Sequence, residues 1–325
     1  MTPRHLLACM LAASAVIAPQ AALAQASTWP TKTVRVMVGS PPGGPSDIVS
    51  RLFAERLQQR TGQSVVVENR PGASNNLAAQ VVAQSDPDGH TLVLSPDTVI
   101  TVNPLVYRKL AFDAKKDLAN VSVLATFTQL LVCHPRVGVK SVAELVALAK
   151  TRSMNYASGG AGVPGHLAAE MFLQTAGIRM QHVPYKGPAP ATMGVLSGEV
   201  DCGFLATPTV LPHAKAGKLV PLAVSSGEPS ALAPDVPTLP KALNREDADI
   251  TFKLVLQARR GTPAATIARI EKHAAEIMRD PEVRAKLQAS DLRAVGGTSA
   301  AAEQAMVADS ARWEPVVKSL GLTLD

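Results

Sequence analysis

The fold follows from the stretch Thr33-Val-Arg-Val-Met-Val-Gly-Ser-Pro-Pro-Gly-Gly-Pro-Ser-Asp47, which runs from a β-rich segment through a glycine-rich turn into an amphipathic helix. The stretch Met154-Asn-Tyr-Ala-Ser-Gly-Gly-Ala-Gly-Val-Pro-Gly-His166 has the same design. Glycine allows backbone N–H groups to turn inward, and a helix start leaves four N–H groups unpaired at the positive end of its dipole. Such a turn can hold an anion. Two such turns, about half a chain apart, predict two lobes that hold one small anion between them.

Apolar β-type runs alternate with helical stretches along most of the chain. Val34–Val38, Val65–Glu68 and Thr91–Ser95, for example, are separated by helical patterns at 46–60 and 74–84. This alternation predicts an α/β fold in which each lobe is a mainly parallel sheet flanked by helices. We expect a first lobe over 25–126, a second lobe over 127–224, and a return segment with C-terminal helices over 225–325 that packs mostly on the first lobe.

Residues 1–24 have the pattern of a signal peptide. Arg4 and His5 form a basic start, an apolar run follows over Leu6–Ala18, and Ala22-Leu-Ala24 supplies the small residues of a cleavage site. The apolar run is shorter than the ~20 residues of a membrane span. We therefore expect cleavage after Ala24 and export to the periplasm.

The composition is that of a mildly basic protein. Loss of Arg4 with the leader lowers the formal net charge from +6 to +5, which suits an anionic ligand. Aromatic residues make up only 3% and no Lys/Arg cluster occurs, so nucleic acid is not an expected partner. Cys133 and Cys202 could pair in an oxidising compartment or remain separate buried thiols, and both alternatives stay open.

The first glycine-rich turn supplies one set of candidate ligand-binding residues. Ser46 or Asp47 could cap the helix that follows, and a plain capped turn is the simpler alternative. The density of glycine and proline exceeds what a chain reversal needs. We take as candidates Pro42, Gly43, Gly44, Ser46 and Asp47.

The second turn formally contains a dinucleotide fingerprint, Gly160-Ala-Gly162-Val-Pro-Gly165. No acidic residue closes a strand about 20 residues later, as that fingerprint requires, so no nucleotide cofactor is expected. A carboxylate held by the same backbone geometry fits better. The candidates are Ser158, Gly159, Gly160, Gly162 and Pro164, with His166 as either a ligand contact or a structural residue.

Further candidates lie where expected strands end, because ligands of open α/β sheets bind at the carboxyl ends of strands. Tyr185 and Lys186 follow one strand, and Ser95 is the last residue of another. Lys186 is either a ligand-binding charge or an ordinary solvated lysine. The chain has no Gly-x-Ser-x-Gly elbow, His-Glu-x-x-His or Cys-x-x-Cys motif, so we expect no catalytic residues and no metal.

A series of short motifs occurs in order along nearly the whole mature chain. It includes Pro41-Pro-Gly-Gly-Pro-Ser-Asp47, Val67-Glu-Asn-Arg-Pro-Gly72, Pro87-Asp-Gly-His-Thr-Leu92, Asn155-Tyr-Ala-Ser-Gly159 and His182-Val-Pro-Tyr-Lys-Gly187. The series resembles the exported receptors of tripartite tricarboxylate transporters, the Bug-type solute-binding proteins. Each motif alone is weak evidence for this family, whereas the whole series in this order is specific to it.

The resemblance implies a two-lobed Venus flytrap that binds a carboxylate in its cleft, partly through backbone N–H groups and waters, and hands it to a membrane permease. The loop that matches Pro42 to Ser46 would serve the first lobe, and the loop that matches Ser158 to Pro164 the second. Leu205, a further candidate, stands where many relatives carry an acidic residue, which disfavours an amino-acid ligand. The stretch Phe252–Arg260 replaces an aromatic segment of many relatives.

Together these features predict a monomeric periplasmic receptor for a small organic carboxylate, with aromatic and dicarboxylic acids among the candidates. Binding would close the two lobes on the ligand. Two alternatives remain open at this point. One is a partner that presents ligand to a membrane sensor kinase, and the other is a secreted α/β hydrolase or isomerase.

Overall fold

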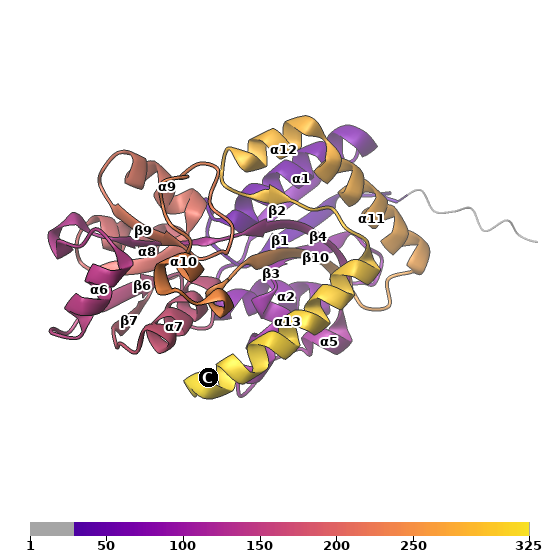
Figure 1. The fold of residues 1–325 in the computed structure, drawn as a ribbon. Helices are drawn as coiled ribbons and strands as arrows, with labels where there is room; N and C mark the ends of the chain where they lie inside the picture. Colours follow the sequence, from indigo (N-terminus) through magenta and orange to yellow (C-terminus); the bar gives the residue numbers. More distant parts are fainter. Residues whose placement is uncertain (1–28, 325) are drawn as a thin grey trace, which may run out of the picture.

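The chain folds into two α/β lobes that lie side by side (Figure 1). The structure, a computed structural model, describes residues 29–324. The expected signal peptide, residues 1–24, lies outside the described residues. Within the described part of the chain, no helix is both long and apolar enough to cross a membrane. The prediction of a two-lobed α/β fold is confirmed.

Each lobe is built on one mixed sheet. The six-stranded sheet has the order β11 (Arg293–Ala294), β4 (Leu118–Phe127), β10 (Phe252–Arg259), β3 (Thr91–Pro96), β1 (Val34–Val38), β2 (Val65–Asn69). The five-stranded sheet has the order β7 (Gln181–Pro184), β6 (Asn155–Ser158), β8 (Cys202–Ala206), β5 (Gln129–Cys133), β9 (Val220–Val224). The sheets are mixed rather than mainly parallel, because β10 pairs antiparallel with β3 and β4, and β5 pairs antiparallel with β8 and β9.

Helices cover both faces of each sheet, so the central strands are apolar on both sides. In β1, Val34 and Val36 join the cluster that contains α1 side chains, while Met37 joins the α2 side. In Figure 1, α1, α11 and α12 lie on one side of the six-stranded sheet, and α2, α5 and α13 on the other. The helices of this lobe are α1 (Pro45–Thr61), α2 (Asn76–Ala83), α3 (Thr98–Thr101), α4 (Asn103–Val106), α5 (Ala114–Asp117), α11 (Ala264–Arg279), α12 (Pro281–Gln288) and α13 (Ser299–Leu320). The other helices are α6 (Val142–Ala149), α7 (Pro164–Ala176), α8 (Pro188–Leu196), α9 (Thr207–Lys215) and α10 (Leu239–Leu243).

The chain passes between the lobes at Thr128, between β4 and β5, and returns before β10. The C-terminal segment adds a third connection. Leu324 forms a β-bridge with Tyr107 of the first lobe, and its side chain lies beside Gly162 of the second. Ser319, in the last turn of α13, accepts a hydrogen bond of 3.2 Å from Gln174 of α7. The C-terminal segment therefore contacts both lobes.

Cys133 and Cys202 form a disulfide, which decides between the two alternatives that the sequence left open. The two cysteines face each other in the antiparallel register of β5 and β8. Both are fully buried in the second lobe. The bond closes a loop with a sequence separation of 69 residues, which restricts the unfolded chain.

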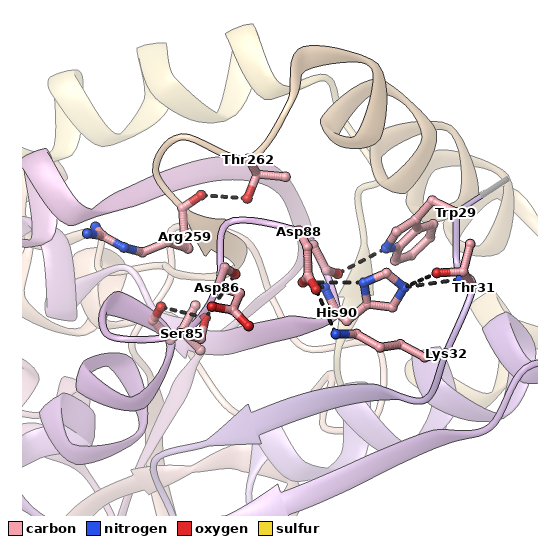
Figure 2. A network of polar contacts seen from close by, with 11 residues as sticks. Trp29, Thr31, Lys32, Ser85, Asp86, Asp88, His90, Arg259 and Thr262 are labelled. Atoms are coloured by element: carbon pink, nitrogen blue, oxygen red, sulfur yellow. Dashed lines mark hydrogen bonds and ion pairs between the residues drawn. The ribbon is translucent and has the colours of Figure 1, made fainter. Parts of the chain in front are cut away.

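A polar network in the first lobe fixes the start of the described chain (Figure 2). The Trp29 indole N–H donates to the Gly89 carbonyl at 3.1 Å, and Lys32 pairs with Asp88 at 2.8 Å. These contacts hold the segment before β1 against the loop before β3. The cluster therefore anchors the start of the described chain to the first lobe.

Candidate functional site: an interlobe cavity

A cavity of about 570 Å³ lies between the two lobes. Its walls come from the turns that precede the helices and from the ends of strands in both sheets. The lining includes Ser40, Pro41, Pro45, Ser46, Ala73, Ser74, Asn75, Tyr107, Phe127, Gln129, Gly159, Gly160, Ala161, Val163, Pro164, Gly165, Tyr185, Lys186, Gly187, Pro188, Phe204, Leu205 and Ala206. The two walls touch at the rim, since a Cβ atom on Gly187 would lie only 2.6 Å from the Pro41 ring.

The helices that begin at this cavity lack side-chain caps. Gly44 is the N-cap of α1, Val163 of α7, Gly187 of α8 and Ala206 of α9, and none offers a capping side chain. Each of these helices has a proline in its first turn, which removes one unpaired N–H. Elsewhere in the described chain five α-helices are capped by side chains, namely those of Asp113, Ser141, Thr238, Asp280 and Thr298, whereas α3, α4 and α11 lack such a cap. The cavity therefore receives several helix starts whose free N–H groups and dipoles favour an anion.

Three polar side chains line the cavity while almost completely buried. Ser46 is 4% exposed, Asn75 is 7% exposed and Gln129 is 2% exposed. None of these side chains has a hydrogen-bond partner among residues 29–324. Buried polar groups are normally paired, and the polar atoms of these three side chains are open to the cavity, so a molecule held there can supply their partner.

The turn before α2 has an unusual backbone. Residues Ala73–Asn75 all adopt positive φ angles, of 45°, 51° and 74°, which non-glycine residues rarely do. The amide of Asn103 holds the turn by donating to the Ser74 carbonyl at 3.0 Å. The Ser74 hydroxyl donates across the cleft to the Ala161 carbonyl and accepts from the Tyr107 hydroxyl. This turn is thus both a wall of the cavity and a contact between the lobes.

The glycine-rich turn before α7 rests on a buried stack of rings. The Tyr156 and His182 rings have centroids 4.9 Å apart, and those of His182 and His166 are 4.0 Å apart. The Gly162 N–H donates to His166 Nδ1 at 2.9 Å, and Ser158 Oγ lies 2.7 Å from His182 Nε2. Burial, with the nearby His182, lowers the pKa of His166 to about 3, and burial lowers the pKa of His182 to about 4. Both rings are neutral at ordinary pH and fix the shape of the turn.

The turn before α1 is shaped by Asp47. Its carboxylate accepts hydrogen bonds from the Gly43 N–H at 3.0 Å, from Arg51 at 2.9 Å and from the Asn69 amide at 2.9 Å. Burial works against ionisation, but the bonds from Arg51, Asn69 and Gly43 outweigh it and lower the pKa of Asp47. The helix begins at Pro45, so Ser46 and Asp47 lie inside its first turn, and the expectation that one of them caps it is wrong.

Lys186 is the one charged side chain that lines the described cavity, and it is exposed at the mouth. No acidic or histidine side chain lines the cavity within residues 29–324. The same part of the chain holds no group of acidic, histidine and cysteine residues that could bind a metal ion. The surface is therefore neutral to positive, with apolar patches from Phe127, Phe204 and Leu205.

The comparisons with known proteins agree with this geometry. A family model described as the tripartite tricarboxylate transporter family receptor matches residues 49–322. The chain belongs to this receptor family. It is 34% identical over 291 residues to a UPF0065 protein of Bordetella bronchiseptica, an alignment that covers 90% of this chain and 85% of that protein.

Two solved structures of family members carry ligands in their descriptions. A Rhodopseudomonas palustris protein with adipate is 32% identical, with a TM-score of 0.87 over 91% of this receptor and 99% of that chain. MatC from the same species, with bound malate, is 26% identical, with a TM-score of 0.84 over 89% and 100% of the two chains. The receptor thus has the two-lobed fold of periplasmic binding proteins.

Seven of the residues predicted from the sequence line the cavity of this receptor: Ser46, Gly159, Gly160, Pro164, Tyr185, Lys186 and Leu205. The others lie behind the lining. Pro42, Gly43, Gly44 and Asp47 form the turn before α1, while Ser158, Gly162 and His166 support the turn before α7. Ser95 is fully buried and donates to the Gln257 side chain at 3.3 Å. Direct ligand contact stays a prediction for all fifteen.

Asn75, Gln129 and the Ser74–Tyr107 pair belong to the cavity but were not predicted from the sequence. A turn of three left-handed non-glycine residues carries no simple sequence signature, so Asn75 was hidden inside an expected helix. Gln129 had a weak signal, because it is a polar residue placed directly before the wholly apolar strand Leu130–Cys133. Gln129 follows the passage between the lobes, and its side chain lines the cavity.

Proposed function

We propose that this chain is an exported receptor that binds a small organic carboxylate between its lobes and delivers it to a membrane permease. The observation that carries the proposal is the set of uncapped helix starts around one cavity. Buried backbone N–H groups need partners, and a carboxylate supplies up to four acceptor positions. Because α1 and α7 belong to different lobes, one anion between them favours the closed arrangement.

The charge of the cavity supports an acid as ligand. Lys186 at the mouth attracts anions, and the apolar side chains of Phe127, Phe204 and Leu205 suit a carbon skeleton. Charged-group hydrogen bonds contribute roughly 1.5–3 kcal/mol each. Three or four of them, less the entropy of association, reach the roughly 8 kcal/mol of micromolar binding. The relatives described with adipate and malate are in keeping with this class.

The same lining supports binding without conversion. The serines Ser40, Ser46 and Ser74 face the cavity, but no histidine or carboxylate that lines the described cavity could activate them as nucleophiles. Export and periplasmic location rest on the signal-peptide pattern of residues 1–24. Delivery to a permease rests on the family, whose printed description is that of a transporter receptor.

A thermal-shift screen tests the proposal. The mature protein is heated with malate, glutarate, adipate, benzoate and glutamate, and with adipamide as an uncharged match for adipate. A ligand at 100 times its Kd should add about 2.7 kcal/mol to the free energy of unfolding. At least one acid should raise the melting temperature while adipamide does not, and prolonged incubation should return that acid unchanged. Failure of every acid, or stoichiometric excess of a product, would refute the receptor function.

A further inference from the structure

Gln129 lines the cavity at the passage between the two lobes. It is the first residue of β5, directly after the passage between the lobes, and its main chain is held by Ser225. Its side chain lines the cavity although the residue is only 2% exposed. Neither atom of its amide group has a hydrogen-bond partner in the described chain. The main chain of Gln129 is therefore fixed, while its side-chain amide lines the cavity without a protein partner.

The surroundings of this amide decide which chemistry it can meet. Its Oε1 atom lies 3.4 Å from the position that a Cβ on Gly165 would take, so the amide stands beside the uncapped first turn of α7. Its other neighbours in the wall, Phe127, Phe204 and Ala206, offer no side-chain donor or acceptor. An anion seated at α7 would accept from the helix N–H groups and come within reach of the amide.

We propose that Gln129 is a ligand-specificity residue whose Nε2–H donates to a carboxylate oxygen of the bound acid at the start of α7. The donor role follows from the positive end of the helix, which favours an acceptor at this place and disfavours an ammonium group. The amide is an uncharged donor, so it recognises the direction of the carboxylate without adding a buried charge. The ligand can therefore still be released from the start of α7. This inference rests on the proposed function and assigns one residue to one group of the ligand.

The test compares Gln129→Leu and Gln129→Glu with the wild type and with Gln181→Glu, an exposed residue of the same lobe that is absent from the cavity lining. Adipate, malate, glutarate and benzoate serve as probes in calorimetric titrations. Gln129→Leu should weaken binding roughly 10- to 100-fold, the factor that one charged-group hydrogen bond supplies. Its melting temperature without ligand should be unchanged or higher, because the substitution removes an unpaired buried amide.

The glutamate variant separates recognition from a structural role. At pH 8 an ionised Glu at position 129 would repel the carboxylate, so binding should fall by more than the leucine variant shows. Burial and the bound anion raise the pKa of such a glutamate, and its protonated form donates an O–H in place of the amide N–H. The ratio of its Kd to that of the wild type should therefore shrink between pH 8 and pH 5. Gln181→Glu should bind like the wild type at both pH values.

The outcomes distinguish this inference from the proposed function. If the wild type binds none of the four acids, both the proposed receptor function and the role of Gln129 are refuted. If the wild type binds an acid and Gln129→Leu binds it within twofold, only the role of Gln129 is overturned. A loss in Gln129→Glu that is the same at pH 8 and pH 5 would likewise assign the residue a merely structural role.

Discussion

Replacement of Gly44 by alanine should weaken ligand binding by obstructing closure of the lobes. Gly44 is the N-cap of α1 and has φ −87° and ψ 173°, an extended conformation that alanine also adopts. The added methyl group would lie 2.9 Å from Cγ of Pro188 on the opposite lobe. Ordinary carbon contacts are about 3.5–4.0 Å, and a proline ring cannot rotate away. The strain therefore falls on the closed state, whereas lobes that have moved apart are free of it.

The magnitude follows from the cost of overpacking. An extra methyl group in a closely packed contact typically costs about 1–3 kcal/mol. Since this cost is paid when the lobes close on ligand, the Kd should rise by about 5- to 100-fold. The melting temperature without ligand should change little. Calorimetric titration with the best acid from the screen gives the Kd, and circular dichroism checks the fold.

Two further variants make this prediction specific. Gly297→Ala is the matched control, because a Cβ there meets only the Ala301 side chain at 3.8 Å. Pro188→Ala removes the obstructing ring carbon, so the double variant Gly44→Ala/Pro188→Ala should recover most of the lost affinity relative to Pro188→Ala alone. Wild-type affinity in Gly44→Ala, or a double variant no better than the single one, would refute the role of this contact in closure.

Other perturbations should give equally definite results. Burial, together with the charge of Asp309, raises the pKa of Asp97 to about 7, so the folded state keeps a proton that the unfolded state releases above about pH 4. The stability that this group contributes is present below pH 4 and is lost as the pH rises to 7. The free energy of unfolding of Asp97→Asn, measured in urea, should therefore rise relative to that of the wild type between pH 4.5 and pH 8. A difference between the two proteins that stays constant over this range would contradict the prediction. Reduction of the Cys133–Cys202 bond should lower the free energy of unfolding by about 2–4 kcal/mol, and an unchanged midpoint with dithiothreitol would count against it. A saturating acid should reduce the radius of gyration in solution scattering relative to a ligand-free protein with open lobes, and an unchanged curve would place the site within one lobe.

Local features of the site could be predicted from the sequence because they depend on neighbouring residues. The turns before α1 and α7 are marked by glycine and proline, whose backbone preferences act within a few positions. The alternation of apolar runs and helical patterns likewise gave the α/β class. Ser46, Gly160 and Lys186 reached the cavity lining through such local reasoning.

Features that depend on residues far apart in sequence were out of reach. The stretch Phe252–Arg259 forms β10, whose antiparallel partners β3 and β4 lie more than 120 residues away in the sequence and are not indicated by its own residues. Gln129 can act in the cavity only because folding brings Gly165 and Phe204 beside it. The cysteine pairing depends on the register of β5 against β8, which neither strand specifies alone.

The C-terminal segment has a practical consequence for anyone who builds a sensor or a tagged form of this receptor. Leu324 accepts a backbone hydrogen bond from Arg108 and donates one to Val106, while its side chain rests against Gly162 in the turn before α7. A tag or fluorescent protein appended there would begin at the seam between the lobes. A fluorophore attached beside Leu324 would sense the lobes moving past one another, so this position suits an optical reporter.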